Sequence, residues 1–176
     1  MLKGLGLTVL ALLLLLGLAA GTAHRKDVSG ATLVVAAADS LFPSHADLAA
    51  DGTDDQEVLQ RAIDRLPAFG GKVLLLEGTF QLTEGLRLRD GVALEGMGAG
   101  TVDDPATAAG VTVLTSEAPI TLALALDADY FQVRRLKLLG GRKGLEVTTT
   151  VGAGPSTAFH IADVVVGGQT ETGDQS

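Results

Sequence analysis

The spacing of apolar residues divides the chain into one helical segment followed by a series of short strands. After Asp51, apolar side chains recur at helical spacing and form a single stripe, at Val58, Leu59, Ala62, Ile63 and Leu66. Pro67 and the pair Gly70–Gly71 are typical signals for the end of a helix. The pattern therefore predicts an amphipathic helix that ends near Leu66.

From Lys72 onward the pattern changes from helical to strand-like. Residues 73–76 form a continuous apolar run, the sequence EGTF at 77–80 predicts a turn, and Leu86 and Leu88 alternate with arginines. These runs are too short, and glycine turns interrupt them too often, for a sheet with helices on both faces. A stack of similar coils explains the pattern better.

Two segments near the end of the chain repeat the same apolar spacing. FQVRRLKLLGG begins at Phe131 and FHIADVVVGG begins at Phe159, 28 residues later. The matching pairs are Phe131 with Phe159, Val133 with Ile161, Leu136 with Val164 and Leu138 with Val166. The repeat predicts two successive rungs whose apolar side chains share one continuous core, with a glycine pair at the end of each rung.

The segment DGTDDQEVLQ, which begins at Asp51, concentrates acidic side chains at the start of the predicted helix. Thr53 and Gln56 have the spacing of a capping box, and Asp54 and Asp55 fall where the positive end of the helix dipole stabilises carboxylates. A calcium site is the alternative, but side chains at one helix end need a second segment to surround an ion. We therefore predict that Thr53, Asp54, Asp55 and Gln56 form a structural helix cap, and we assign no metal ligand.

The stretch from Ala46 to Val102 resembles the N-terminal part of the pectate-lyase-like right-handed parallel β-helix superfamily. In that group an acidic DG-TDD segment opens a short helix that caps the solenoid, and a GG-x-V-x-L-x-x-G-x-F/Y pattern leads into the first coil. The corresponding residues here are 51–55, 70–73, Gly78 and Phe80. The resemblance implies an all-β fold, a right-handed parallel β-helix (solenoid) with a short N-terminal capping α-helix.

The same resemblance leaves the activity open. The superfamily includes polysaccharide lyases, polygalacturonase-like hydrolases, phage depolymerases and surface proteins without chemistry. Its lyases use an arginine or lysine base and often calcium held by aspartates, whereas its hydrolases use paired aspartates. An enzyme, a lyase or glycoside hydrolase, and a calcium cofactor are thus implied by resemblance only, and no catalytic residue is identified in the sequence.

A basic cluster is the remaining candidate site. It consists of Arg134, Arg135, Lys137, Arg142 and Lys143. Alternation with the apolar positions predicts that Arg135 and Lys137 point outward, where the cluster could bind an acidic polysaccharide. The alternative is a solvated face on which Asp163, placed beside Arg135 by the 28-residue repeat, balances the arginine.

Charge and composition narrow the choice of partners. The 176-residue chain carries 13 basic and 21 acidic residues, for a formal net charge of -8, which argues against nucleic acid as a partner. It contains no cysteine, so burial and backbone pairing must stabilise it without disulfides, as suits a regular β architecture.

Residues 1–23 have the layout of a secretory signal peptide: one lysine, a leucine-rich run and small residues up to Ala23. An uncleaved membrane anchor is the alternative, because the apolar part approaches the roughly 20 residues that span a bilayer. We expect a secreted or cell-surface protein that has no membrane contact after cleavage.

The remaining chain divides into an N-terminal segment at 24–45 that enters the fold, a capping helix with the first coils at 46–168, and a polar tail at 169–176. No amphipathic segment after Gly168 could cover the last rung, so we expect a C-terminal truncation. The sequence favours a β-helix protein or fragment that is noncatalytic by itself and could bind acidic polysaccharide. The alternative is the N-terminal part of a polysaccharide lyase or glycoside hydrolase that acts on polyuronates.

Overall fold

The computed structural model describes residues 31–101, 103–104, 109–150 and 158–169. The predicted signal peptide and residues 170–176 of the predicted tail lie outside this part of the chain. The elements in chain order are β1 (Thr32–Ala36), η1 (Pro43–His45), β2 (Leu48–Ala49), α2 (Gln56–Arg65), β3 (Gly71–Leu75), β4 (Gly78–Gln81), β5 (Leu86–Leu88), β6 (Val92–Glu95), β7 (Thr112–Ser116), β8 (Thr121–Leu126), β9 (Phe131–Gly140), β10 (Lys143–Thr148) and β11 (Phe159–Gly167).

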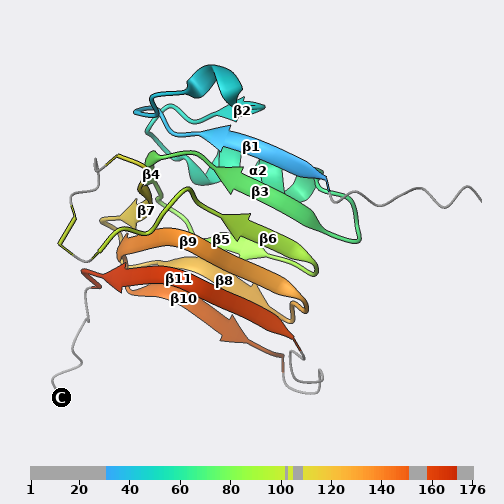
Figure 1. Cartoon of the computed structure of the whole chain (residues 1–176). Coiled ribbons are helices and arrows are strands. Elements are labelled where there is room, and N and C mark those ends of the chain that lie inside the picture. The colour runs from blue at the N-terminus through green and yellow to red at the C-terminus, as the bar shows by residue number, and fades with distance from the viewer. Residues whose placement is uncertain (1–30, 102, 105–108, 151–157, 170–176) are drawn as a thin grey trace, which may run out of the picture.

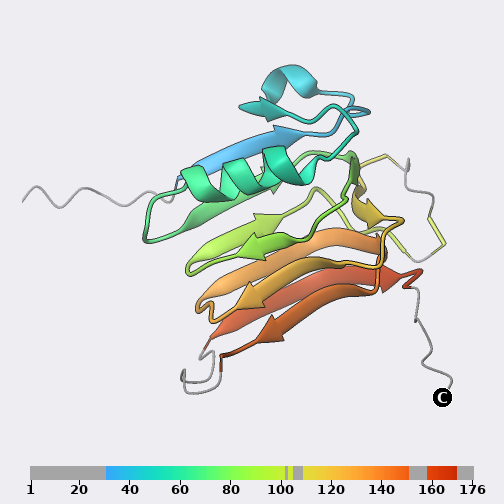
Figure 2. The same cartoon turned by 180° about the vertical axis from the view of Figure 1, so that it is seen from behind.

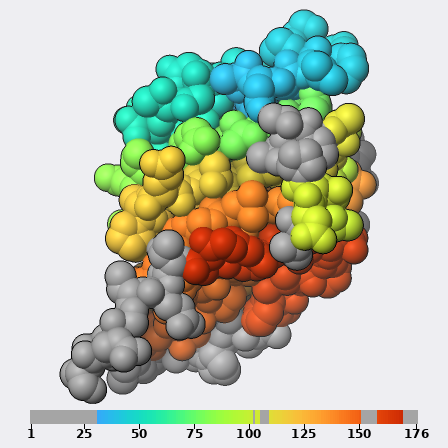
Figure 3. Space-filling model, turned by 90° about the vertical axis from the view of Figure 1, so that its left-hand side faces the viewer, coloured from blue at the N-terminus to red at the C-terminus, as the bar shows by residue number. Residues whose placement is uncertain are grey.

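The strands form two parallel sheets. The larger sheet has the order β2-β1-β3-β6-β9-β7-β4, with β11 also paired to β9, and the smaller has the order β10-β8-β5. Every strand pair in both sheets is parallel. Figures 1 and 2 show the sheets on opposite sides of the molecule. The space-filling view in Figure 3 shows the colours passing from blue at one end of the molecule, through green and yellow, to orange and red toward the other.

The core lies between the two sheets and is built from rows of aliphatic residues. One row crosses five strands of the larger sheet, through Leu33, Val73, Leu94, Val133 and Ile161, which are successive register partners. The smaller sheet contributes buried leucines and alanines from β5 and β8. Like side chains on adjacent parallel strands lie directly above one another, so each row buries apolar surface continuously along the stack.

The predicted amphipathic helix is confirmed as α2, the single α-helix of the described residues. Its stripe buries Leu59, Ala62 and Ile63 completely. Figure 2 shows α2 beside β1 and above β5, at the end of the smaller sheet. The helix therefore covers the core where that sheet has no further strand.

The predicted 28-residue repeat is confirmed by the pairing of β9 with β11. Phe131 is opposite Phe159, Val133 opposite Ile161, Leu136 opposite Val164 and Leu138 opposite Val166. The β9 members of these pairs are fully buried, and Val164 packs against the core. Ile161 and Val166 remain exposed, because no described strand lies beyond β11.

The larger sheet bends in the middle of β9. The first half of β9 pairs with β6 and the second half with β7. Arg135, between the halves, has φ 53°, and Asp163 at the equivalent place in β11 has φ 52°. Gly96, which directly follows β6, takes this place beside Arg135, and an added Cβ there would lie 2.4 Å from the Arg135 carbonyl oxygen. The two left-handed residues redirect the chain at the same level of the neighbouring strands β9 and β11.

Two further features differ from the sequence prediction. The EGTF segment, predicted as a turn, contains the start of β4, which begins at Gly78 and pairs with β7. Strand β1 lies before Ala46 and pairs with both β2 and β3. The sheet thus begins within the segment at 24–45.

Candidate functional site

The acidic segment at the start of α2 is a structural junction, but its predicted capping box is wrong. The helix begins at Gln56 with Asp55 as the N-cap residue, so Thr53 lies outside the helix. Asp54 has φ 50° and turns the chain between Thr53 and the helix. The Thr53 amide instead donates to Asp51 Oδ1 at 2.9 Å, a local turn that aspartate commonly forms.

The carboxylate of Asp55 joins this junction to the end of β4. It is buried, and its two oxygens accept hydrogen bonds from the Gly52 amide at 2.9 Å and the Gln81 amide at 2.8 Å. The hydroxyl of Thr83 donates to Asp54 Oδ1. These acids satisfy backbone and hydroxyl donors, so they hold the helix to the sheet rather than surround an ion.

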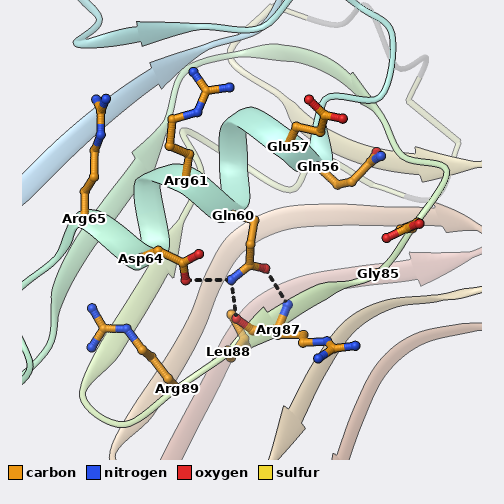
Figure 4. Close-up of a pocket in the computed structure, with 11 residues that line it drawn as sticks. Gln56, Glu57, Gln60, Arg61, Asp64, Arg65, Gly85, Arg87, Leu88 and Arg89 are labelled. Atoms are coloured by element: carbon orange, nitrogen blue, oxygen red, sulfur yellow. Dashed lines mark hydrogen bonds between the residues drawn. The ribbon is translucent and has the colours of Figure 1, made fainter.

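The groove between α2 and β5 has a volume of about 830 Å³ and is shown in Figure 4. Across it, Gln60 Nε2 donates to Asp64 Oδ1 and to the Arg87 carbonyl oxygen, and Gln60 Oε1 accepts from the Arg87 amide. Arg89 donates to three backbone carbonyls at the C-terminal end of α2, at 2.6–3.1 Å. Arg61 points away from β5. These bonds join the helix to the sheet across the groove.

The structure divides the predicted basic cluster into three parts. Arg134 and Arg135 lie together on β9 beside Glu95, whereas Arg142 and Lys143 lie at the start of β10. The fifth residue, Lys137, is buried and does not share a surface with either pair. The five cations therefore do not form one continuous surface.

The prediction that Lys137 points into solvent is wrong, because its side chain is fully buried. Its strand neighbours Leu136 and Leu138 do face the core, as the alternation requires. Asp104, which lies between β6 and β7, contacts the opposite face: Lys137 Nζ donates to the Asp104 carbonyl oxygen at 2.7 Å. Val113, the register partner of Lys137 on β7, is also fully buried.

At the start of β10, Arg142 and Lys143 are exposed. Lys143 Nζ lies 2.6 Å from Glu146 Oε1, and this hydrogen bond is the main cause that lowers the pKa of Glu146. The Arg142 amide donates to the Ile120 carbonyl oxygen at 2.7 Å. One of the two cations is thus already paired with a carboxylate.

Glu95 is the centre of the main charged site, the Glu95 cluster, which consists of Lys72, Glu95, Arg134 and Arg135. Glu95 Oε2 lies 2.8 Å from Lys72 Nζ and 2.9 Å from an Arg134 guanidinium nitrogen, and Oε1 lies 3.3 Å from Arg135. The residues come from β3, β6 and β9, three adjacent strands. Glu95 is buried, whereas the side chains of all three cations are 33–46% exposed.

The electrostatics of the Glu95 cluster favour anions. The hydrogen bond from Lys72 is the main cause that lowers the pKa of Glu95, and the charges of the two arginines lower it further. One carboxylate faces three cations, so two positive charges remain uncompensated. Within the described residues, Arg134 Nε is buried without a hydrogen-bond partner. A bound carboxylate or sulfate would meet partly exposed donors here, whereas a metal cation would be repelled.

The predicted balance between Arg135 and Asp163 is not formed. Asp163 does lie beside Arg135 in the register of β11 and β9. The described residues contain no ion pair between them, and Arg135 instead contacts Glu95 and donates from Nε to the Gly96 carbonyl oxygen at 3.2 Å. Sequence reasoning missed Lys72 as a member of the site. Glu95 and Arg134 are direct register partners, whereas Lys72 pairs with Ala93 and reaches Glu95 diagonally.

Comparison of the chain with known protein families, curated proteins and solved structures gives no match. Among residues 31–169, apart from the gaps given above, no three His, Cys, Asp or Glu side chains are grouped to hold a metal ion. The same part of the chain has no helix that is long and apolar enough to cross a membrane.

Proposed function

We propose that the chain forms the first coils of a right-handed parallel β-helix of the pectate-lyase-like kind and that α2 caps its first end. The support is the order in which the chain passes through β3, β4 and β5 and then through β6, β7 and β8. Each strand of the second pass pairs in parallel with its counterpart in the first. In the larger sheet β6 pairs with β3 and β7 with β4, and in the smaller sheet β8 pairs with β5. The β9–β10 pass repeats the arrangement, and residue-by-residue stacking is the construction principle of a solenoid.

The proposed role is noncatalytic binding of an acidic polysaccharide at the Glu95 cluster. The observation that supports it is the convergence of Lys72, Arg134 and Arg135 on one carboxylate at the outer face of the larger sheet. Lys137 is no longer part of the proposed surface because it is buried. Arg142 and Lys143 supply a separate exposed basic patch.

The same geometry argues against general acid–base catalysis at the Glu95 cluster. A catalytic carboxylate needs a pKa near the working pH, whereas three cations lower the pKa of Glu95. Glu95 therefore remains ionised and paired at neutral pH. Binding is expected to be weak and salt-sensitive, because the cations are partly exposed and the net charge of -8 repels an acidic polymer.

Titration with polygalacturonate at low and high salt tests this role. The double variant Arg134→Gln, Arg135→Gln should lose most of the binding. The matched control Arg61→Gln, Arg65→Gln removes the same charge from α2 and should retain it. Equal losses in both variants would show that only net charge matters, and this result would overturn the assignment of the site.

A cleavage assay separates the binding role from the enzyme alternative. The chain is incubated with polygalacturonate and calcium while the absorbance of unsaturated products and the release of reducing ends are followed. We expect no sustained product formation by either measurement. Sustained cleavage that Arg135→Gln abolishes would reject the noncatalytic role and favour a lyase or hydrolase.

We further propose that the protein is exported and that the mature chain begins near His24. The layout of residues 1–23 supports this proposal. N-terminal sequencing of the processed protein tests it. Retention of residues 1–23 in a membrane fraction would favour the anchored alternative.

A further inference from the structure

A shallow hollow, the Phe69 hollow, lies beside the Glu95 cluster and shares Lys72 with it. Its volume is about 330 Å³. The residues that line it are Thr32, Phe69, Gly70, Gly71, Lys72, Gly91 and Ala93. Thr32, Lys72 and Ala93 are successive register partners on β1, β3 and β6, which lie side by side in Figure 1. The next residue of each strand belongs to the aliphatic row of the core, so these three side chains point outward.

Lys72 supplies a positive charge at the wall of the Phe69 hollow. Its side chain is 38% exposed, and its Nζ lies 2.8 Å from Glu95 Oε2. An ammonium group carries three N–H donors, so the contact with Glu95 leaves donors for a second carboxylate. The Glu95 cluster also has two more positive than negative charges. The hollow therefore suits a ligand that carries a carboxylate.

Phe69 supplies an exposed aromatic ring at the same hollow. It is 61% exposed. Of the other exposed phenylalanines, Phe42 stacks on His45 and Phe159 stacks on Phe131, whereas the described part of the chain shows no ring contact for Phe69. Neither core packing nor ring stacking accounts for an aromatic side chain at this position, and an exposed aromatic surface of this kind is typical of a binding site.

The backbone around Phe69 is held in a fixed turn. The Gly70 amide donates to the Pro67 carbonyl oxygen at 2.8 Å, and the Gly71 amide donates to the Gly91 carbonyl oxygen at 3.1 Å. Gly70 has φ 95°, and an added Cβ there would lie 2.1 Å from the Gly91 carbonyl oxygen. The turn thus packs directly on the next rung. Such preorganisation lowers the entropy that a ligand must lose to bind beside Phe69.

We propose that the Phe69 hollow binds one sugar ring of a polyuronate, with the ring against Phe69 and the carboxylate at Lys72. A pyranose ring presents C–H groups on its faces and hydroxyl groups around its rim. The C–H groups complement the negative face of an aromatic ring, and the Thr32 hydroxyl can donate to or accept from the rim. This inference rests on the proposed binding role of the Glu95 cluster and adds a preference for uronate sugars over other polyanions.

Two polymers separate recognition of the ring from recognition of charge. Polygalacturonate and poly-L-glutamate both carry one carboxylate per repeat, but only polygalacturonate has sugar rings. Fluorescence anisotropy of end-labelled polymers of equal mean length measures the affinity of the 176-residue chain at low salt. Phe69→Ala should weaken the binding of polygalacturonate about fivefold, the effect of one aromatic contact, and leave the binding of polyglutamate unchanged. Arg134→Gln, Arg135→Gln should weaken both.

Matched variants test the position and the chemistry of the site. Phe42→Ala removes a phenylalanine that is 54% exposed and lies outside the hollow, so it should bind both polymers as the unchanged chain does. Phe69→Tyr keeps an aromatic ring and should retain the affinity for polygalacturonate. Ala93→Leu fills the hollow from β6 and should reproduce the loss seen in Phe69→Ala. Circular dichroism verifies that each variant is folded.

A fluorescent side chain at position 69 reports binding at the hollow directly. The chain has no tryptophan, so Phe69→Trp introduces a single reporter. Polygalacturonate should shift its emission in a saturable manner, whereas polyglutamate should leave the emission unchanged. Equal shifts with both polymers would contradict selection of the sugar ring.

The affinities also distinguish failure of this inference from failure of the proposed function. If Phe69→Ala weakens the binding of both polymers equally, or of neither, the sugar site is overturned and the Glu95 cluster remains a site for anions. If the unchanged chain binds no polygalacturonate at low salt, the proposed function itself is rejected, and the sugar site with it.

Discussion

The side-chain amide of Gln60 forms two hydrogen bonds with the backbone of Arg87. Gln60 Oε1 accepts from the Arg87 amide at 2.9 Å, and Nε2 donates to the Arg87 carbonyl oxygen at 3.3 Å (Figure 4). Gln56, one helical turn earlier, forms the equivalent pair of bonds with the Thr83 amide and hydroxyl. A primary amide carries the same donor and acceptor as a peptide group, so α2 replaces a neighbouring strand at the edge of β5.

Replacement of Gln60 should therefore weaken the contact between α2 and β5. We expect Gln60→Ala to lower the free energy of unfolding by about 1 kcal/mol, because both bonds are exposed and each contributes modestly. Urea denaturation measures the change. Glu57→Ala, at an exposed position of the same helix, should stay within about 0.5 kcal/mol of the unchanged chain. Equal effects at the two positions would mean that the bonds from Gln60 to Arg87 do not stabilise the contact between α2 and β5.

The junction between α2 and β4 should depend on Asp55 and not on Thr53. Asp55→Ala removes a buried acceptor and leaves the Gln81 amide without its partner. The expected loss is about 2–4 kcal/mol in the free energy of unfolding. Thr53→Ala should change it by less than about 0.5 kcal/mol, as at other exposed positions. A larger loss at Thr53 than at Asp55 would restore the capping box.

The local sequence pattern predicted the helix of this chain correctly, but not the contacts of the residues that begin it. The apolar stripe predicted α2 because helix burial follows a local period. The cap was misassigned because Asp55 bonds to Gln81, which belongs to the end of β4. A motif of four residues contains no information about such a contact.

The same limit explains what was missed in the basic cluster. The 28-residue repeat gave the correct register of β9 and β11, but it did not extend to β3 and β6. Lys72 and Glu95 could not be placed beside Arg134 without that register. Lys137 was misplaced for a different reason: alternation gives the face of a strand, whereas its burial depends on the loop that contains Asp104.

Chemical labelling can test the burial of Lys137. An amine-reactive reagent should modify Lys72 and Lys143, whose side chains are 38% and 48% exposed. Lys137 is fully buried and should react far more slowly under native conditions. Mass spectrometry of labelled peptides measures each rate, and labelling in urea provides the control for intrinsic reactivity. Similar native rates at all three lysines would contradict the position of the covering loop.

The Glu95 cluster should make stability depend on pH in the acidic range. The pKa of Glu95 is lowered in the folded chain, first by the hydrogen bond from Lys72. Its contribution is therefore complete above the ordinary glutamate pKa of about 4.3 and is lost as the pH falls through the lower folded value. The difference in urea midpoint between the unchanged chain and Glu95→Gln should shrink from pH 7 to pH 3. A constant difference would mean that the ion pairs do not contribute through the charge of Glu95.

Removal of the central carboxylate should strengthen the binding of acidic polymers. Glu95 occupies donors of Lys72, Arg134 and Arg135, so Glu95→Gln exposes three cations without their internal counter-ion. One charge at this distance is worth about 1 kcal/mol in water, which corresponds to about a fivefold gain in affinity for polygalacturonate at low salt.

The control for that gain is Glu146→Gln, which removes the same charge from a carboxylate paired with Lys143. It should change the affinity by less than about twofold, because it leaves the Glu95 cluster intact. The gain in Glu95→Gln should also fall as salt is raised, since the exposed cations are screened. Both affinities are measured at pH 7 on variants whose urea midpoints show that they are folded. If Glu146→Gln strengthens binding as much as Glu95→Gln does, the polymer responds to net charge, and the Glu95 cluster is not its binding site.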